Sequence, residues 1–137
     1  MVKAQRGFTL VELITVMILI GIISMSLFSR IGAVTSANVQ AGRDDLIAAL
    51  FFAQQTAMAR SGIQLTLSAT SINITENGSS IVVPSVGYPL SLPSGVTATT
   101  ATLVYDKLGR TTATTITLSS SNGASAQIKV EASGYAY

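Results

Sequence analysis

The sequence predicts an α+β fold in which a long N-terminal helix packs on an antiparallel β-sheet. Three observations lead to this prediction. An apolar run from Phe8 to Ser29 is long enough to span a membrane as a helix. Apolar residues then recur at three- and four-residue spacing between Asp44 and Ser61, which is typical of an amphipathic helix. After Gly62 the apolar period changes to two, which is typical of strands.

The composition excludes several kinds of protein. A chain of 137 residues has room for one globular domain beside the apolar run. Lys3 and Arg6 account for the formal charge of +2, because the remaining six basic residues equal the six acidic ones. A nearly neutral chain is not expected to bind nucleic acid. Without histidine or cysteine, we expect no disulfide framework, no metal site, no cofactor and no catalytic residue.

The first seven residues form a short basic segment that ends in Gly7. A secretory signal peptide carries its apolar region before the cleavage site, whereas here the apolar run follows Gly7. Glu12 is the only ionisable side chain between Phe8 and Ser29. A carboxylate in such a run costs a few kcal/mol, so it is expected to have a partner and a role.

This chain start resembles the prepilin processing site of type IV pilins and type II secretion pseudopilins, over residues 1–28. The pattern is a basic leader, a glycine and then an unbroken apolar helix with an early glutamate: Lys3-Ala4-Gln5-Arg6-Gly7 followed by Phe8-Thr9-Leu10-Val11-Glu12. The resemblance implies that a prepilin peptidase recognises the leader through Lys3 and Arg6, cuts between Gly7 and Phe8, and N-methylates Phe8. It also implies a pilin-like fold.

Glu12 has a plausible partner in the amine that cleavage exposes on Phe8, which is positive near neutral pH. The two residues lie one helical turn apart, so pairing within one chain is sterically possible. Pairing between Glu12 of one subunit and Phe8 of the next would be a head-to-tail contact, which generates open filaments. The resemblance implies this role in assembly and register. The alternative is that Glu12 reaches the cytoplasmic edge of the membrane.

The charges beside the apolar run predict its orientation. Lys3 and Arg6 precede the run and Arg30 follows it, so we expect a single-pass inner-membrane protein with a cytoplasmic N-terminus and a periplasmic C-terminal domain. An ordinary signal-anchored protein would have the same topology, but that reading accounts for neither Gly7 nor Glu12.

Four segments follow from these boundaries. They are a leader peptide (residues 1–7), a transmembrane and filament-core helix (8–29), an amphipathic helical continuation (30–61) and a periplasmic β-rich domain (62–137). Continuity of the helix past Gly32 and Gly42 stays open, because glycine weakens a helix interior. Asp44 and Asp45 also suit a helix start. The apolar face of the second helical segment should contain Leu46, Ala49, Leu50, Ala53, Ala57 and Met58, with Ile47 and Phe51 alongside.

The β-rich domain should be an antiparallel sheet of five to seven strands, with one face covered by the helix. Asn77-Gly78 is a strong turn signal, and residues 84–95 hold all three prolines and should form a loop. A second turn is expected at 107–110. Strands are expected at 63–67, 72–75, 81–83, 96–100, 102–106, 111–118 and 126–132, with a short edge at 135–137.

Two functional classes stay open. The first is a structural minor pilin or pseudopilin, with other pilin subunits and an inner-membrane assembly platform as partners. The C-terminal half resembles pseudopilin H, FimT-type minor pilins and minor pilin C of the mannose-sensitive haemagglutinin (MSHA) pilus, the last being favoured. The absence of cysteine counts against a major pilin. The residues that carry this resemblance are 44–60, 62–67, 105–110 and 130–134.

The second class is a filament-tip binding module that contacts surfaces or DNA. Its candidate patch consists of Lys107, Arg110 and Lys129 with Tyr105, although a solvated strand edge explains these residues equally well. Asp106 beside Lys107 and Arg110 is better explained as a hairpin turn than as a catalytic site. We therefore expect a substrate of an enzyme rather than an enzyme.

Overall fold

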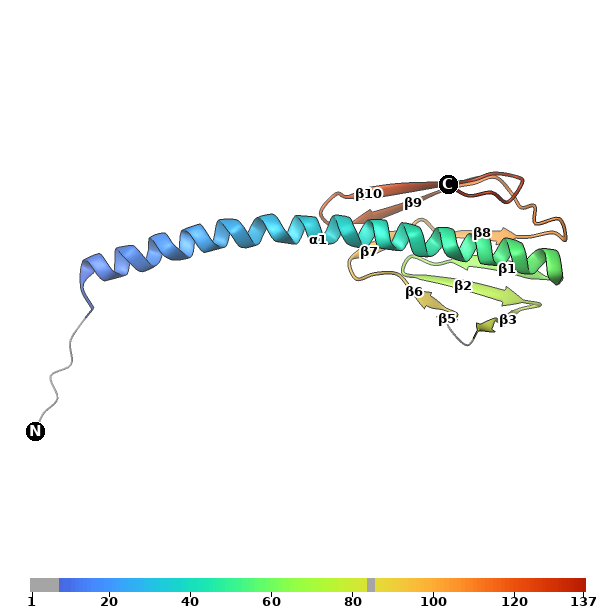
Figure 1. Cartoon of the computed structure of the whole chain (residues 1–137), viewed down its shortest axis with the longest axis horizontal. Helices are drawn as coiled ribbons and strands as arrows, with labels where there is room; N and C mark the ends of the chain where they lie inside the picture. The colour runs from blue at the N-terminus through green and yellow to red at the C-terminus, as the bar shows by residue number, and fades with distance from the viewer. Residues whose placement is uncertain (1–7, 84–85) are drawn as a thin grey trace, which may run out of the picture. The chain divides into compact units, whose positions relative to one another are not determined.

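The computed structural model describes residues 8–83 and 86–137 (Figure 1). It has an α+β, pilin-like arrangement, with a long N-terminal helix followed by antiparallel strands, as the sequence predicted. The chain divides into two compact units, the N-terminal unit (residues 1–34) and the globular unit (residues 35–137). The proposed leader, including Lys3, Arg6 and Gly7, lies outside the described residues.

Helix α1 spans Leu10–Ala59. It continues through Gly32 and Gly42, which answers the question that the sequence left open. Asp44 and Asp45 consequently do not begin a helix but lie exposed in its interior. The helix ends two residues earlier than expected, and Gly62 follows with a φ of +76°. A Cβ at Gly62 would overlap the side-chain oxygen of Asn77, so this exit requires glycine.

Within the N-terminal unit, α1 is apolar around its whole circumference. The window Leu10–Leu27 has a mean hydropathy of 2.4, and none of it is buried inside the structure. By length and composition this part of α1 is able to cross a membrane. A helix that is apolar on all sides and is not covered by its own chain must be buried in a membrane or against other proteins.

The strands are short and pair antiparallel in three sheets, rather than in the one sheet that the sequence predicted. The largest sheet has the order β3-β2-β1-β8, with β6 also paired to β2. A second sheet has the order β10-β9-β7, and β4 pairs with β5. The strands are β1 Ile63–Leu67, β2 Ser71–Glu76, β3 Ser79–Ser80, β4 Val82–Val83, β5 Val86–Gly87, β6 Leu90–Ser91, β7 Val96–Ala98, β8 Ala101–Val104, β9 Thr114–Ser120 and β10 Ser125–Val130.

The chain changes sheet between β7 and β8. The amide of Ala98 donates to Ala69 beside the larger sheet, and the amide of Thr99 donates to Thr117 in β9, each at 2.9 Å. Residues 84–95, expected to be an irregular loop, contribute β5 and β6 to the sheets. Val130 forms an isolated bridge to Ala136, so the last residues add an edge beside β10, as predicted (Figure 1).

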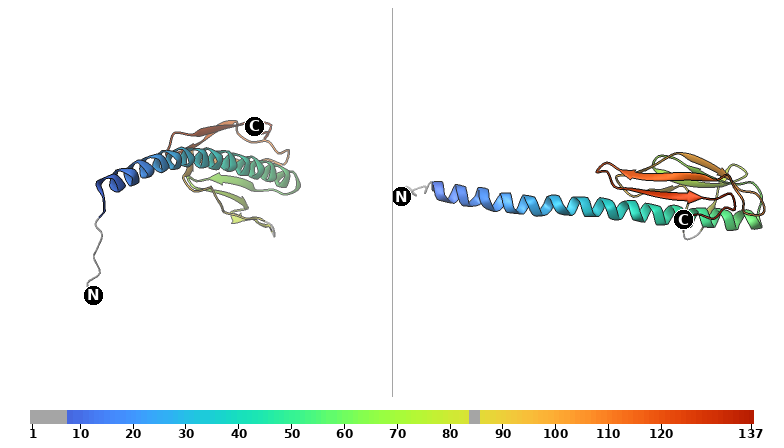
Figure 2. Two further views of the ribbon diagram at one scale, coloured as in Figure 1. Left: turned by 60° about the vertical axis from the view of Figure 1, so that its left-hand side comes forward. Right: turned by 90° about the horizontal axis from the view of Figure 1, so that it is seen from above.

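The core of the globular unit lies between α1 and the two larger sheets (Figures 1 and 2). Strand residues alternate strictly, so that every second side chain is buried, as in β1 with Ile63, Leu65 and Leu67. Small side chains on α1 allow the helix backbone to lie close to the sheets. The buried helix residues are Val39, Leu46, Ala49, Leu50, Ala53 and Ala57. Met58 and Phe51 were wrongly placed with this face, because they are 54% and 41% exposed.

Candidate processing and assembly site

Thr9 caps the N-terminus of α1. Its side-chain oxygen accepts a hydrogen bond from the amide of Glu12 at 3.2 Å, and its carbonyl accepts one from the amide of Leu13, also at 3.2 Å. The first amides of a helix have no partner within the helix, and a threonine at this position supplies one. A threonine followed three residues later by glutamate is the sequence pattern of a capping box. The capping box was not predicted from the sequence, although both of its residues, Thr9 and Glu12, belong to the motif discussed there.

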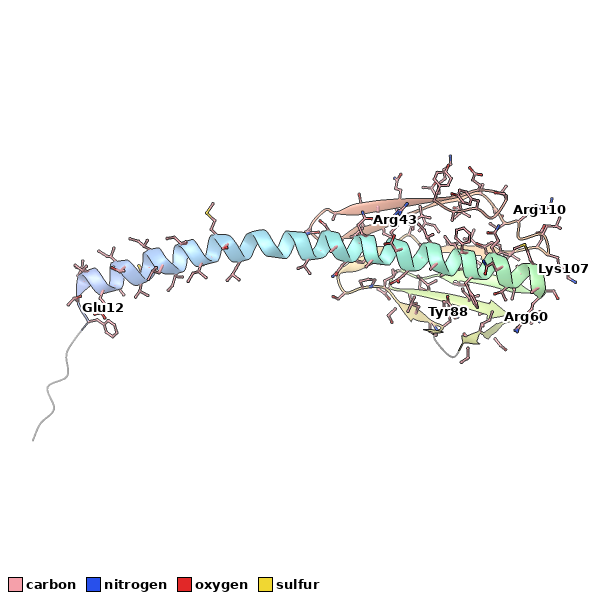
Figure 3. All side chains as sticks on the ribbon, in the orientation of Figure 1. Glu12, Arg43, Arg60, Tyr88, Lys107 and Arg110 are labelled. Atoms are coloured by element: carbon pink, nitrogen blue, oxygen red, sulfur yellow. The ribbon has the colours of Figure 1, made fainter. Side chains whose placement is uncertain are left out.

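Glu12 lies in the first turn of α1 and is exposed (Figure 3). Its negative charge is favourable there, because the N-terminal end of a helix carries a partial positive charge. Within residues 8–83 and 86–137, the ion pairs of the structure are formed by Asp44, Glu76 and Asp106. Phe8 is 83% exposed in front of the cap.

The bond between Gly7 and Phe8 therefore lies immediately before the capped helix start. Cleavage there would leave only Phe8 and Thr9 ahead of the helical residues. A new positive amine at this point would be repelled by the partial positive charge of the helix N-terminus. A carboxylate one turn further along compensates for this repulsion, and the same carboxylate is exposed to a neighbouring chain. The local geometry thus suits both pairings that the sequence left open.

The model for the prokaryotic N-terminal methylation motif matches residues 2–28. The chain carries a type IV prepilin-like signal. The match includes the basic leader, Gly7, Phe8, Glu12 and most of the apolar run, and it supports a substrate of the type IV pilin or pseudopilin type. It does not extend into the globular unit. Comparison with curated proteins and with solved structures gave no match.

The residues suggested for a DNA-binding patch on this prepilin-like chain do not form one surface. Tyr105 is buried, with 4% of its surface exposed, and burial raises its pKa to about 12. Its ring is therefore part of the core and is not available to stack on a base. Lys107 and Arg110 lie in the turn after β8, near the C-terminal end of α1, whereas Lys129 lies on β10 (Figure 3).

Asp106 organises that turn. Its carboxylate accepts hydrogen bonds from the amides of Leu108 (2.9 Å) and Arg110 (2.8 Å) and from Nε of Arg110 (2.9 Å). These bonds, first among them that from the Arg110 amide, lower the pKa of Asp106. A carboxylate occupied in this way stabilises a turn, as expected at 107–110. The turn is not part of a hairpin, because β8 and β9 on either side of it belong to different sheets. No cluster of three potential metal ligands occurs in the described part of the chain.

The globular unit also has an open pocket of about 450 Å³ beside the end of α1. Its walls include Phe52, Ala59, Ile81 and Val82, and Phe52 stacks on Tyr88 with ring centroids 6.0 Å apart. Arg60, which also lines the pocket, is paired with Glu76 at 3.0 Å. The other polar side chains of the lining are Gln55 and Thr56.

Proposed function

We propose that this protein is a structural minor pilin or pseudopilin. A prepilin peptidase removes residues 1–7 by cutting between Gly7 and Phe8, and methylates the new amine of Phe8. The mature protein is then incorporated into a type IV pilus of the MSHA type or into a type II secretion pseudopilus, or it primes assembly of that filament. Lys3 and Arg6 serve leader recognition and membrane orientation, and Glu12 serves assembly and register.

One observation carries this proposal. The methylation motif over residues 2–28 includes a capped helix start and the whole apolar window Leu10–Leu27, and none of that window is buried inside the structure. Such a helix requires a bilayer before assembly and other apolar helices afterwards. The C-terminal half of the same helix supplies buried side chains to the core of the globular unit.

The proposed location follows from the charges around the apolar segment. The precursor is a single-pass inner-membrane protein with a cytoplasmic N-terminus, and residues 62–137 form its periplasmic β-rich domain. Residues 8–29 form the transmembrane and filament-core helix, and 30–61 its amphipathic continuation. The partners are the prepilin peptidase, other pilin subunits and the inner-membrane assembly platform. No cofactor, metal or catalytic step is part of this function, and nucleic acid is not a proposed partner.

Intact-mass analysis of the membrane-extracted protein tests the cleavage. In cells with a prepilin peptidase, we expect the wild-type chain to lose residues 1–7 and gain one methyl group. Gly7→Ala should leave the full-length precursor. Gly21→Ala is the matched control, because a Cβ at Gly21 meets no atom within 4 Å. Processing of Gly7→Ala at the wild-type rate would contradict the proposal.

A filament-tip binding module is the second candidate function. It is favoured by one feature of the globular unit, the exposure of two neighbouring tyrosines, Tyr135 (51%) and Tyr137 (44%), at the edge of the β10-β9-β7 sheet. A minor subunit that carries such a surface is able both to be incorporated into a filament and to bind a ligand at the filament tip.

A further inference from the structure

Tyr135 and Tyr137 form a fixed pair of exposed rings. Their centroids are 5.7 Å apart with an interplanar angle of 29°, and Tyr135 makes an edge contact with Phe51 of α1 at 6.4 Å and 89°. The backbone of Tyr137 exchanges two hydrogen bonds with Lys129 (2.9 and 3.1 Å), and the carbonyl of Tyr135 accepts one from Glu131 (2.8 Å). The rings are thus held in place before any ligand arrives, which lowers the entropy lost on binding.

The rings continue into a polar sheet face. Lys129 of β10 is paired with Thr115 of β9 and, on the other edge of β10, with Tyr137. Gln127 of β10 is paired with Thr117 of β9. Residues directly opposite one another share a face of the sheet, and the alternate residues Ile116, Leu118, Ile128 and Val130 point into the core. The outer face therefore carries hydroxyl, amide and ammonium groups next to two aromatic rings.

The charges on this face nearly cancel. Lys129 is the only cation between residues 114 and 137, and Glu131 is the only anion. The ammonium of Lys129 is also 5.8 Å from the centre of the Tyr137 ring, so it is held by that ring. Binding of a nucleic acid backbone requires several cations along its path, which this surface lacks.

The polar rows also differ from a protein-docking surface. The centre of a protein interface is apolar and closely packed, whereas the rows beside the tyrosines are threonine, glutamine and serine. Thr97 and Ser119 extend these rows with hydroxyls 3.3 Å apart. Hydroxyl and amide groups both donate and accept hydrogen bonds, as the hydroxyl groups of a sugar do. The faces of aromatic rings carry negative charge density and attract the positively polarised C–H groups of a sugar ring.

We propose that Tyr135 and Tyr137, together with the polar outer face of β9 and β10, form a binding site for a neutral polysaccharide of hexose or N-acetylhexosamine units. The exposed parts of the two tyrosine rings contact C–H groups of the sugar rings, and Gln127, Thr115 and Thr117 contact the hydroxyl groups. The site lies wholly in the globular unit. It is independent of leader cleavage and filament assembly, so the failure of either proposal leaves the other standing.

Co-sedimentation of the detergent-solubilised full-length protein tests this site. The probes are cellulose, chitin and cross-linked dextran as neutral polysaccharides, with heparin beads and immobilised single-stranded DNA as charged comparisons. We expect binding to at least one neutral polysaccharide, unchanged when salt is raised to about 1 M, because screening acts on charged partners. Tyr135→Ala and Tyr137→Ala should each weaken that binding by about two- to tenfold.

Three further variants separate the causes of such a loss. Tyr137→Phe keeps the ring and should keep the binding. Lys107→Gln removes a cation from the turn after β8, outside this face, and should change the binding less than twofold, since the ligand is neutral. Val104→Ala removes an exposed apolar side chain from β8 and should have no effect. Circular dichroism and thermal melting establish that each variant is folded.

Four outcomes would overturn the proposal. They are no binding to any of the three neutral polysaccharides, binding only to heparin or DNA with loss at high salt, equal binding by the folded tyrosine variants, and a loss of self-association rather than of polysaccharide binding in those variants. The last outcome would assign the tyrosines to an interface between copies of this chain.

Discussion

The backbone amide of Glu12 donates a hydrogen bond to the side-chain oxygen of Thr9 at 3.2 Å. The helix cap at Thr9 and the carboxylate of Glu12 therefore lie together at the first turn of α1. The proposed cleavage position, between Gly7 and Phe8, lies just before the cap. The cap ensures that the helix begins at a defined residue.

Removal of the cap should loosen this turn. Thr9→Ala removes the oxygen that accepts from Glu12, and loss of such a cap typically costs about 1 kcal/mol, a factor of roughly five in local opening. Amide hydrogen exchange of residues 10–13 in detergent micelles should quicken by that factor. Thr9→Ser, which keeps the hydroxyl, serves as the control. Equal exchange in Thr9→Ala and wild type would show that the bond does not stabilise the helix start.

Replacement of Glu12 should separate processing from assembly. Glu12→Gln keeps the size of the side chain but removes the charge that is proposed to pair with the Phe8 amine. We expect the leader to be removed normally, and the amount of protein in sheared filaments to fall at least about tenfold, as for loss of about 1.4 kcal/mol of contact energy. Quantitative immunoblotting of cell and filament fractions measures both. Normal incorporation of Glu12→Gln would exclude the pairing and favour a carboxylate that merely lies at the membrane edge.

The secondary structure was largely predictable because it follows from local periodicity. The alternation Ile63, Leu65, Leu67 and the spacing Leu46, Leu50, Ala53 correspond to the sides that are buried. Continuity at Gly42 was not predictable, because the local cost of glycine in a helix argues against it. Gly42 packs against a segment about fifty residues away, because a Cβ there would lie in ordinary van der Waals contact with Pro93 at 3.4 Å.

The division of the strands into three sheets could not be predicted from local sequence patterns either, because it also depends on contacts between distant segments. The pairing of β7 with β9, and of β1 with β8, is decided by contacts between distant segments. At the candidate site, Glu12 and the cleavage position were proposed from the resemblance of residues 1–28, and they stay predictions. The Tyr135–Tyr137 pair could not be predicted, because its exposure depends on an edge that forms only when residues 135–137 fold back on β10.

Gly134 should be far less tolerant of substitution than Gly123. Both have a positive φ, +85° and +88°, so alanine at either costs about 1–2 kcal/mol in backbone strain. A Cβ at Gly134 would also overlap the carbonyl oxygen of Gly109, whereas one at Gly123 meets no atom within 4 Å. The overlap should add at least about 2 kcal/mol of destabilisation in urea denaturation followed by near-ultraviolet circular dichroism. Equal stability of the two variants would mean that the loops around Gly109 and Gly134 are not packed together.

The turn at Asp106 should make the stability of the globular unit depend on acid pH. The bond from the Arg110 amide, with further bonds from the Arg110 side chain and the Leu108 amide, lowers the pKa of this carboxyl in the folded state. In the unfolded chain the carboxyl has its ordinary pKa of about 3.9, so between the two values the unfolded state binds more protons. The stabilisation is therefore fully present above about pH 4 and is lost as the pH falls through the folded pKa.

Asp106→Asn provides the comparison, because the amide oxygen still accepts the backbone bonds while the charge is removed. Wild type should be the more stable of the two at about pH 7, and the difference should shrink toward zero at about pH 2. Lys107→Gln, in the same turn, is the control and should leave the pH dependence unchanged. A carboxyl resonance of Asp106 that titrates at or above about 3.9 in the folded protein would contradict this account. So would a wild-type advantage that grows as the pH falls, since a lowered pKa gives the opposite sign.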